Sequence, residues 1–227
     1  MIAPTQENPG ASRNKIPAIA RDLVFVDVET TGLNPHEHEI IELAAVRTSP
    51  DALLVRNSIE HLVLPVHIET AHPKALEVNG YDAERWVRDA VLLEMALYRF
   101  VNLCYGGVTL VAHNATFDWG FLRESLSRKH SGGTGIDYHI ICTASLAWPL
   151  VMQGGIESPK LEKLCDHFGI SNDGQHRAMR DVQRTIEVYK RLMPHNAPRD
   201  GTKCPECHGE LMGLAECHNQ TCSYVRT

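Results

Sequence analysis

The sequence lacks any apolar run long enough to cross a bilayer, and its N-terminus lacks the basic-then-apolar layout of a secretory signal. We therefore expect a cytoplasmic protein without membrane association. Positive charge is also scarce, because 22 lysines and arginines stand against 28 aspartates and glutamates, a formal net charge of −6. This balance argues against a protein that grips nucleic acid by bulk electrostatics, although bound divalent cations can supply positive charge locally.

No internal repeat is visible, and 227 residues can bury a full core, which predicts one main domain and a small appendage. Residues 1–18 are rich in Pro, Asn, Ser and Gly and are expected to form a flexible tail. The main domain is expected over 19–193. Residues 194–203, with two prolines and a glycine, are the clearest linker, and the appendage follows at 204–227.

Apolar patterning predicts an α/β main domain with a mixed sheet flanked by helices, because three strand-like runs precede alternating helices and strands. We expect the five strands at 23–29, 39–47, 53–64, 108–113 and 138–142. We expect helices at 72–78, 87–103, 115–128, from 143, from 159, and at 178–192. In the second of these helices the expected apolar stripe consists of Val87, Val91, Leu92, Met95 and Phe100.

Two carboxylates, Asp27 and Glu29, stand at the end of the first expected strand. Residues two apart on a strand point to one face, so these side chains project together. Open α/β sheets place their ligands at the carboxyl ends of strands. Two carboxylates this close repel unless a cation lies between them or one is protonated. The pair indicates a cation site, with a solvated strand end as the alternative, since exposed acids are common.

Three further residues, Asp118, His176 and Asp181, have the chemistry to complete such a site. Asp118 lies about one turn into an expected helix, where the helix dipole favours an acid in any case. His176 and Asp181 would lie roughly 140° apart around a helix axis, so we expect Asp181 on the helix and His176 on the loop before it. A lone loop histidine is more often a surface residue than a base. Buried carboxylates are costly unless paired or bound to a cation, which favours one shared metal site.

These residues carry a resemblance. The segments Asp27–Leu33 (DVETTGL), His113–Asp118 (HNATFD) and His176–Asp181 (HRAMRD) resemble the three motifs of the DEDDh, or DnaQ-like, 3′→5′ exonuclease family, especially its polymerase proofreading subunits. The segment 161–170 also resembles the stretch before the third motif in that group. The likeness runs from about residue 21 to residue 193, with the motifs in the family's order.

The resemblance implies a ribonuclease-H-like fold, two Mg²⁺ or Mn²⁺ ions, and release of nucleoside 5′-monophosphates from a 3′ end. Carried over by position, Asp27 would bridge both metals, and Glu29 and Asp181 would hold the metal that binds the attacking water. Asp118 would support the second metal, and His176 would take the proton from the water. Histidine titrates near neutral pH, and carboxylates favour Mg²⁺ or Mn²⁺ over zinc, so the residue types suit these roles.

The same resemblance suggests which residues meet the substrate. Phe117 and Leu33 would stack on or wedge the terminal base, although buried packing is an equally good interpretation of both. The terminal nucleotide would be contacted by Thr30, Thr31, His113 and Asn114.

The preferred substrate is the 3′ end of DNA, in proofreading or repair and with a DNA polymerase or replication protein as a possible partner. The alternatives are a 3′→5′ exoribonuclease and a non-catalytic nucleic-acid-binding module. The segment 72–80 replaces the family's usual stretch, so the resemblance specifies the reaction better than the substrate.

Four cysteines crowd the appendage in two pairs, Cys204 with Cys207 and Cys217 with Cys222. A hairpin-sized stretch, 210–215, separates the pairs. In a cytosolic chain this arrangement predicts one structural zinc in a zinc-ribbon-like segment, with disulfides or free thiols as alternatives. His208 or His218 could replace one cysteine. A segment this small would depend on the metal for its folding.

Overall fold

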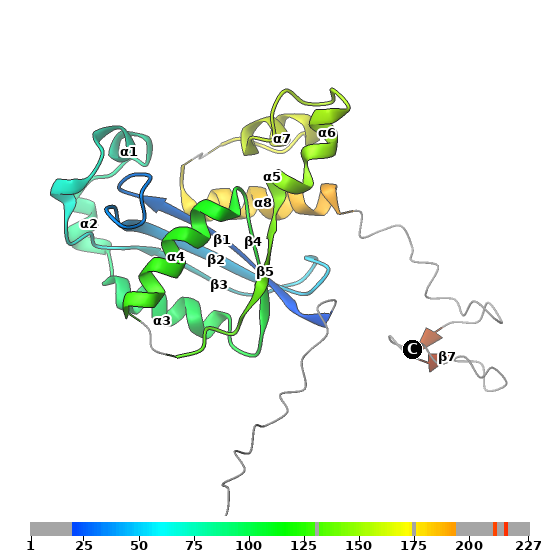
Figure 1. The fold of residues 1–227 in the computed structure, drawn as a ribbon, viewed down its shortest axis with the longest axis horizontal. Coiled ribbons are helices and arrows are strands. Elements are labelled where there is room, and N and C mark those ends of the chain that lie inside the picture. Colours follow the sequence, from blue (N-terminus) through cyan, green and yellow to red (C-terminus); the bar gives the residue numbers. More distant parts are fainter. Residues whose placement is uncertain (1–19, 130–131, 174–175, 194–210, 213–215, 218–227) are drawn as a thin grey trace, which may run out of the picture.

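The computed structural model describes residues 20–129, 132–173, 176–193, 211–212 and 216–217, the last two stretches as backbone alone. Its centre is a five-stranded mixed sheet in the order β3-β2-β1-β4-β5 (Figure 1). The strands are β1 (Asp22–Thr30), β2 (Ile40–Thr48), β3 (Val55–Leu62), β4 (Val108–Ala112) and β5 (Ile136–Cys142). The first three pair antiparallel, and β4 joins β1 and β5 in parallel, which confirms the expected mixed sheet.

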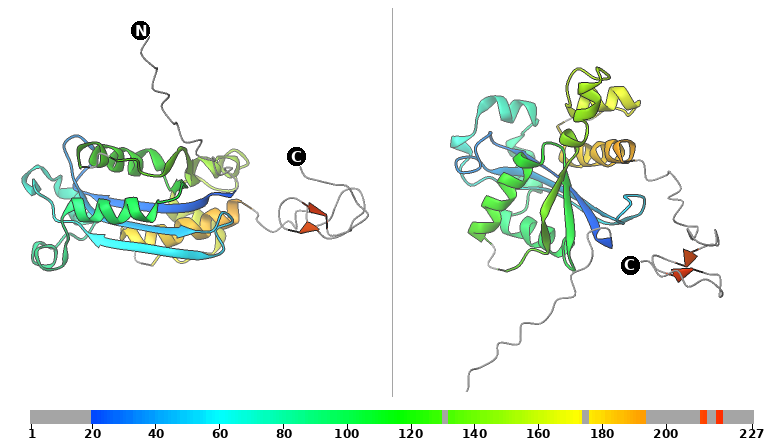
Figure 2. Two further views of the ribbon diagram at one scale, coloured as in Figure 1. Left: turned by 90° about the horizontal axis from the view of Figure 1, so that it is seen from below. Right: turned by 45° about the vertical axis from the view of Figure 1, so that its right-hand side comes forward.

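Helices cover both faces of the sheet (Figures 1 and 2). On one face, α3 (Leu93–Leu103) and α4 (Ala115–Lys129) pack on the first core cluster, and on the other, α8 (Ala178–Leu192) packs on the second. The remaining helices are η2 (Ile68–Thr70), α1 (Pro73–Val78), α2 (Ala83–Asp89), α5 (Thr143–Leu146), α6 (Trp148–Met152) and α7 (Leu161–Phe168). Among the described residues, no helix has the length and apolar character needed to cross a bilayer.

The alternation of side chains along β1 decides where the acids point. Val24 and Val26 belong to the cluster under α3 and α4, whereas Leu23 and Phe25 belong to the cluster under α8. Because side chains two residues apart share a face, Asp27 continues the row of Leu23 and Phe25 toward α8. The strand is therefore buried on both faces until the acids begin.

The expected single helix over 87–103 is wrong, because the chain forms α2 and α3 with an extended break between them. Asp82 caps the N-terminus of α2 by accepting a hydrogen bond from the backbone N–H of Arg85. In the break, Val91 N–H donates to Leu62 O, and Val91 O accepts from Leu64 N–H. The backbone of Val91 therefore pairs with the end of β3 instead of continuing a helix.

The expected apolar stripe of that helix is wrong as well. Val87, Leu92 and Met95 are exposed, and of the five residues only Phe100 is fully buried. The buried face of α3 is made by Ala96, Leu97, Phe100 and Leu103. The break at Val91 resets the helical phase, so spacing counted across it pointed to the wrong face.

Two short strands, β6 (Leu211–Met212) and β7 (Glu216–Cys217), pair antiparallel in the appendage, where a hairpin-sized stretch was expected. The expected tail 1–18, the linker 194–203, and Cys204, Cys207 and Cys222 lie outside the described residues. For Cys217 only the backbone is described.

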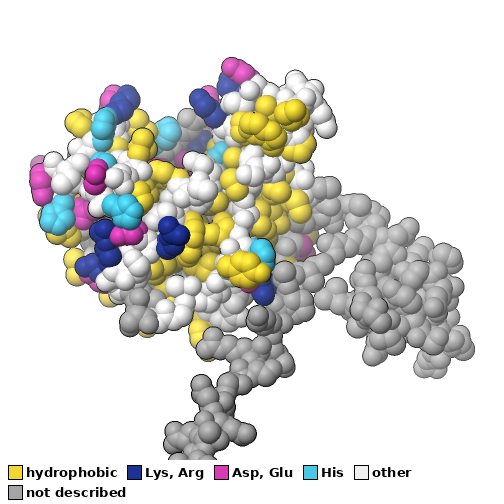
Figure 3. All heavy atoms as spheres, in the orientation of Figure 1, with side chains coloured by type: hydrophobic (Ala, Val, Ile, Leu, Met, Phe, Trp, Pro, Cys, Tyr) yellow, Lys and Arg dark blue, Asp and Glu magenta, His cyan; other side chains and the backbone are white. Residues whose placement is uncertain are grey.

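Surface charge is mixed on the face shown in Figure 3. Histidine and acidic side chains gather on the side of α1, and hydrophobic side chains gather over α6, where Trp148 and Met152 are exposed. Lysine and arginine side chains lie scattered among acids on this view of the described residues.

Candidate metal centre

The end of β1 presents two half-buried acids, Asp27 and Glu29, at the point where the strand leaves its ladder. The pairing with β2 shifts register between Glu29 and Thr30. Such irregularities re-aim side chains at strand ends. The chain then turns through Gly32, where a Cβ atom would lie 2.2 Å from a ring carbon of His38, so that a larger residue would displace that ring.

The second motif brings Asp118 to this strand end from α4. Its side chain is buried, at 2% exposure, and lies in the first turn of the helix. The backbone N–H of Val28 donates to Asp118 Oδ1 at 3.1 Å. Asp118 is therefore fixed between the two acids of β1, at the residue that separates them in sequence.

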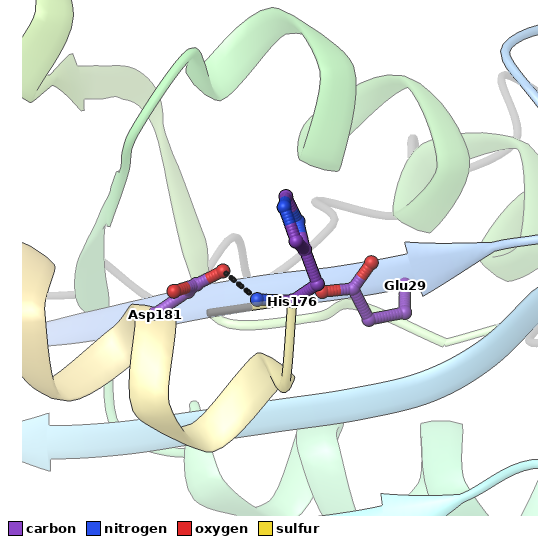
Figure 4. Close-up of side chains that lie close together, drawn as sticks. All are labelled: Glu29, His176 and Asp181. Carbon is purple, nitrogen blue, oxygen red and sulfur yellow. Dashed lines mark hydrogen bonds between the residues drawn. The ribbon is translucent and has the colours of Figure 1, made fainter. Parts of the chain in front are cut away.

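The third motif contributes Asp181 from the first turn of α8 and His176 from the turn before that helix (Figure 4). Glu29, His176 and Asp181 each offer a ligand atom, and these atoms lie within 4.8 Å of one another. The backbone N–H of His176 donates to Asp181 Oδ2 at 3.3 Å. The prediction that Asp181 lies on the helix and His176 before it agrees with this arrangement.

Three acids of this centre, Asp27, Glu29 and Asp118, have raised pKa values, first because burial disfavours their charged forms. The pKa of Asp27 lies well above its ordinary value, through burial and then through repulsion by Asp118 and Glu29. Burial, together with repulsion by Glu42 and Asp118, raises the pKa of Glu29 to about 8. Burial raises the pKa of Asp118 to about 7, against the lowering effect of the Val28 N–H.

Three residues of the centre were missed by the sequence analysis: Glu42, Arg177 and Arg184. Glu42 is fully buried on β2, directly opposite Glu29. Arg177 donates to both carboxylate oxygens of Glu42, with Nε–Oε2 at 3.1 Å and Nη2–Oε1 at 3.4 Å. Buried Arg184 forms an ion pair with Asp181. The available signal was an acid inside the apolar run of β2, together with arginines one residue after His176 and three after Asp181.

The expected substrate contacts of the first motif fall into two groups. Thr30 and Thr31 are buried, and their hydroxyls serve the turn itself: Thr30 Oγ1 donates to Gly32 O at 2.6 Å, and Thr31 Oγ1 accepts from Glu39 N–H at 2.9 Å. Leu33 is 83% exposed. Contact of all three with a nucleotide stays a prediction, and only Leu33 offers a free side chain for it.

The expected contacts of the second motif lie around the start of α4. Asn114 is exposed, in the left-handed conformation with φ of 61°, and Phe117 is half-buried against Phe121. His113 is half-buried, and its Nδ1 lies 3.0 Å from Thr143 Oγ1. Burial lowers the pKa of His113 to about 4, so its ring is neutral at pH 7. Their contacts with a nucleotide likewise stay predictions.

The segment 72–80, where the sequence departs from the family pattern, is tied to the first motif. Backbone N–H of His72 donates to Thr31 O at 2.7 Å. The buried side chain of Asn79 donates to Thr30 O at 2.9 Å. Both bonds end on backbone oxygens beside the acids, so α1 is held against the same strand end as the acids.

Comparison with known proteins assigns the chain to a family. The exonuclease family (RNase_T) matches residues 24–189, a range that contains the four acids and His176. This chain belongs to the exonuclease family.

Two relatives of this exonuclease have names that refer to different nucleic acids, one to RNA and one to DNA. Ribonuclease T of Histophilus somni (strain 129Pt) is 30% identical over 186 residues, which cover 76% of this chain and 83% of that protein. A DNA polymerase III of PolC type from Caldanaerobacter subterraneus subsp. tengcongensis is 31% identical over 173 residues. Those residues cover 76% of this chain but 12% of the polymerase.

Among solved structures, the fold is similar to that of E. coli exonuclease I in complex with a dA16 oligonucleotide. The TM-score is 0.65 at 20% sequence identity, and the match covers 77% of this chain and 42% of that chain. This likeness confirms the expected ribonuclease-H-like exonuclease fold. The chain spans less than half the length of exonuclease I.

The residues of this exonuclease fit hard divalent cations. Carboxylate oxygens are the ligands that Mg²⁺ and Mn²⁺ prefer, and histidine adds a nitrogen donor beside Glu29 and Asp181. Burial raises the pKa values of Asp27, Glu29 and Asp118, and repulsion by neighbouring carboxylates raises those of Asp27 and Glu29 further. A cation between them would remove that repulsion.

Proposed function

We propose that this exonuclease removes nucleotides one at a time from the 3′ end of a nucleic acid, releasing nucleoside 5′-monophosphates. Asp27, Glu29, Asp118 and Asp181 would hold two divalent cations, Mg²⁺ or Mn²⁺. The observation that carries the proposal is the meeting of Glu29, His176 and Asp181 within 4.8 Å, at the end of the strand that also bears Asp27.

In this proposal the chain supplies ligands, a base and a binding surface. When bound, the cations lower the pKa of water and stabilise charge on the attacking and leaving oxygens. The exposed imidazole of His176 accepts the proton that the attacking water gives up. Leu33, Phe117 and Asn114 lie on the segments that follow β1 and β4, where they would meet the terminal nucleotide.

DNA is the first substrate that we propose, in proofreading or repair and with a DNA polymerase or replication protein as partner. RNA is the second candidate, because the match to ribonuclease T extends over 83% of that protein. The match to the DNA polymerase III subunit epsilon of Treponema pallidum, over 78% of that protein, equally supports DNA. Because the net charge is negative, the cations and the strand end would supply most of the attraction for phosphate.

The test uses the full chain with DNA and RNA oligonucleotides of one sequence, each labelled at the 5′ end in one sample and at the 3′ end in another. With Mg²⁺ or Mn²⁺ we expect a ladder of shortened 5′-labelled products and early release of labelled 5′-mononucleotide from the 3′ end. EDTA and the matched Asp27→Asn variant should stop both. Endonucleolytic fragments, cleavage from the 5′ end, or binding without cleavage would each contradict the proposal.

We further propose that the catalytic domain spans 19–193 and that 194–203 link it to a zinc-ribbon-like segment. Cys204, Cys207, Cys217 and Cys222 would hold one zinc. The antiparallel pairing of β6 with β7, which ends at Cys217, supports a hairpin of the ribbon kind. Elemental analysis of the full chain should find one zinc, retained in Cys142→Ser and lost in Cys207→Ser. A zinc-free wild type would contradict this proposal without touching the exonuclease assignment.

A further inference from the structure

An ion pair joins Arg177, the residue after His176, to Glu42 in the interior of the sheet. Two nitrogens of Arg177 donate to the Glu42 carboxylate, at 3.1 and 3.4 Å, although the two residues are 135 positions apart in sequence. The Glu42 side chain is 1% exposed and that of Arg177 35%. A guanidinium bound to a carboxylate through two nitrogens has a defined orientation, which a lysine could not reproduce.

The backbone beside this pair is in a conformation that needs support. His176 is exposed, yet its φ is +60°, in the left-handed region. That region costs a residue other than glycine about 1 kcal/mol or more unless neighbouring contacts hold it. Arg177 is the next residue, and its carbonyl accepts the backbone N–H groups of Arg180 and Asp181, which open α8. A contact that holds Arg177 in place therefore also holds the turn at His176 and the start of α8.

A separate contact holds Asn172, which precedes His176 in the chain. Arg184 Nη1 donates to Asn172 Oδ1 at 3.2 Å, and Asn172 Nδ2 donates to Asp166 Oδ1 at 2.7 Å. Arg184 also pairs with Asp181, so changing it would disturb a metal ligand directly. Arg177 bonds Asp181 through backbone atoms alone, so changing the side chain of Arg177 or Glu42 removes no described contact of the Asp181 carboxylate and provides the cleaner test.

Stability alone is a poor explanation for this pair. Moving two charges out of water costs several kcal/mol, and buried ion pairs often contribute nothing net compared with apolar residues of the same size. Glu42 also stands directly opposite Glu29, where two negative charges repel each other. The presence of Glu42 next to Glu29 is therefore better explained by the position in which Glu42 holds Arg177.

We propose that Arg177 and Glu42 are positioning residues for the base, and that their two-point ion pair holds the turn of His176 so that its imidazole stays beside Glu29 and Asp181. The proposal rests on the proposed function, in which His176 accepts the proton of the attacking water. Neither residue of the pair needs to touch the substrate.

The test compares Arg177→Met with Arg180→Met, because Arg180 is an exposed arginine in the first turn of α8 whose side chain bonds Gln183. We expect Arg177→Met to lower kcat about 10- to 100-fold, the range for a displaced catalytic group, with KM and Mn²⁺ affinity changed less than about threefold. Arg177→Lys should recover only part of the loss. Arg180→Met should match the wild type.

A double-mutant cycle with His176→Ala separates positioning from structure. If Arg177 acts through the imidazole, Arg177→Met should cost nothing further in kcat once His176 is alanine. An equal loss in both backgrounds, or an unchanged kcat in Arg177→Met, would overturn the proposal. Hydrogen exchange gives a readout without catalysis: the amides of Arg180 and Asp181 should exchange faster in Arg177→Met than in Arg180→Met.

Unfolding of a variant and inactivity of the wild type are the two remaining outcomes of the test. Arg177→Met leaves a buried charge on Glu42 and can unfold the protein, so Glu42→Gln/Arg177→Gln, which removes both charges, is measured beside it. This double variant should show the same loss of kcat. If both variants unfold, the pair is a requirement of the fold and the proposal fails. A wild type inactive on every substrate would contradict the proposed function, whereas an active wild type with unaffected variants contradicts only the positioning role.

Discussion

The second and third motifs have one spacing and two different outcomes. In each, a histidine precedes an aspartate by five residues, as His113 precedes Asp118 and His176 precedes Asp181. Each aspartate is buried in the first turn of a 15-residue helix, α4 or α8, and each motif contains a left-handed residue before the helix. The two motifs thus form the same local structure, a left-handed residue followed by a helix with a buried aspartate in its first turn.

The two copies differ in their surroundings. His113 lies against Thr143, with a pKa lowered by burial to about 4, whereas His176 is exposed. Asp118 accepts a backbone N–H from β1, whereas Asp181 pairs with an arginine. The comparison shows that a histidine becomes a candidate base through solvent access and neighbouring carboxylates, and that motif spacing alone does not provide these.

The largest effect is expected when a metal ligand is removed. Asp27→Ala or Asp181→Ala should abolish hydrolysis with the fold intact. Lost charge stabilisation of several kcal/mol corresponds to roughly 10³-fold or more in rate. Cleavage of labelled oligonucleotide, with circular dichroism as the control for folding, measures this. Near-wild-type activity of either folded variant would contradict the metal assignment.

The two histidines should differ next. His176→Ala should lower kcat roughly 10²- to 10⁴-fold, the usual range for a lost acid–base group. His113→Ala should cost less by roughly a factor of ten or more, because a ring with a pKa of about 4 is a weak base at pH 7 and its Nδ1 already lies 3.0 Å from Thr143 Oγ1. Rate–pH profiles provide the second readout. Equal losses in the two variants would mean that the copies are equivalent.

The two aspartates should have opposite effects on stability without metal. In EDTA at pH 8.5, Asp118→Asn should stabilise the protein, because the amide oxygen still accepts the Val28 N–H while a repelling charge is gone. Asp181→Asn should destabilise it by about 3 kcal/mol, because Arg184 is left as an unpaired buried charge. Urea unfolding measures both. Changes of the same sign would contradict the difference in surroundings.

The smallest effect concerns pH. Glu29 has a folded pKa of about 8 against 4.5 when unfolded, so between these values the folded state holds a proton that the unfolded state releases. The stability from that proton is present below pH 4.5 and is lost as pH rises toward 8. In EDTA we expect Tm to fall by about 5 °C from pH 6 to 8.5, at roughly 2–4 °C per kcal/mol. Saturating Mn²⁺ should abolish the fall, and a flat Tm in EDTA would refute the raised pKa.

Much of the fold followed from pattern alone. The five strands and the helix over 178–192 lie where the sequence placed them, because each is a continuous local signal. The helix expected over 87–103 failed because its break is held by backbone bonds of Val91 to β3, a partner far away in sequence. The spacing of apolar residues within one segment does not reveal a hydrogen bond to a distant segment.

Sequence by itself determined the donor chemistry: three motifs in order, their five residues, and the side of β1 to which Asp27 and Glu29 point. Tertiary structure alone decided how those charges are balanced. It set Glu42 opposite Glu29, brought Arg177 across the sheet to Glu42, and buried Arg184 against Asp181. The physical reason is that a pKa or an ion pair depends on distance and burial, which residues far apart in sequence acquire only when the chain folds.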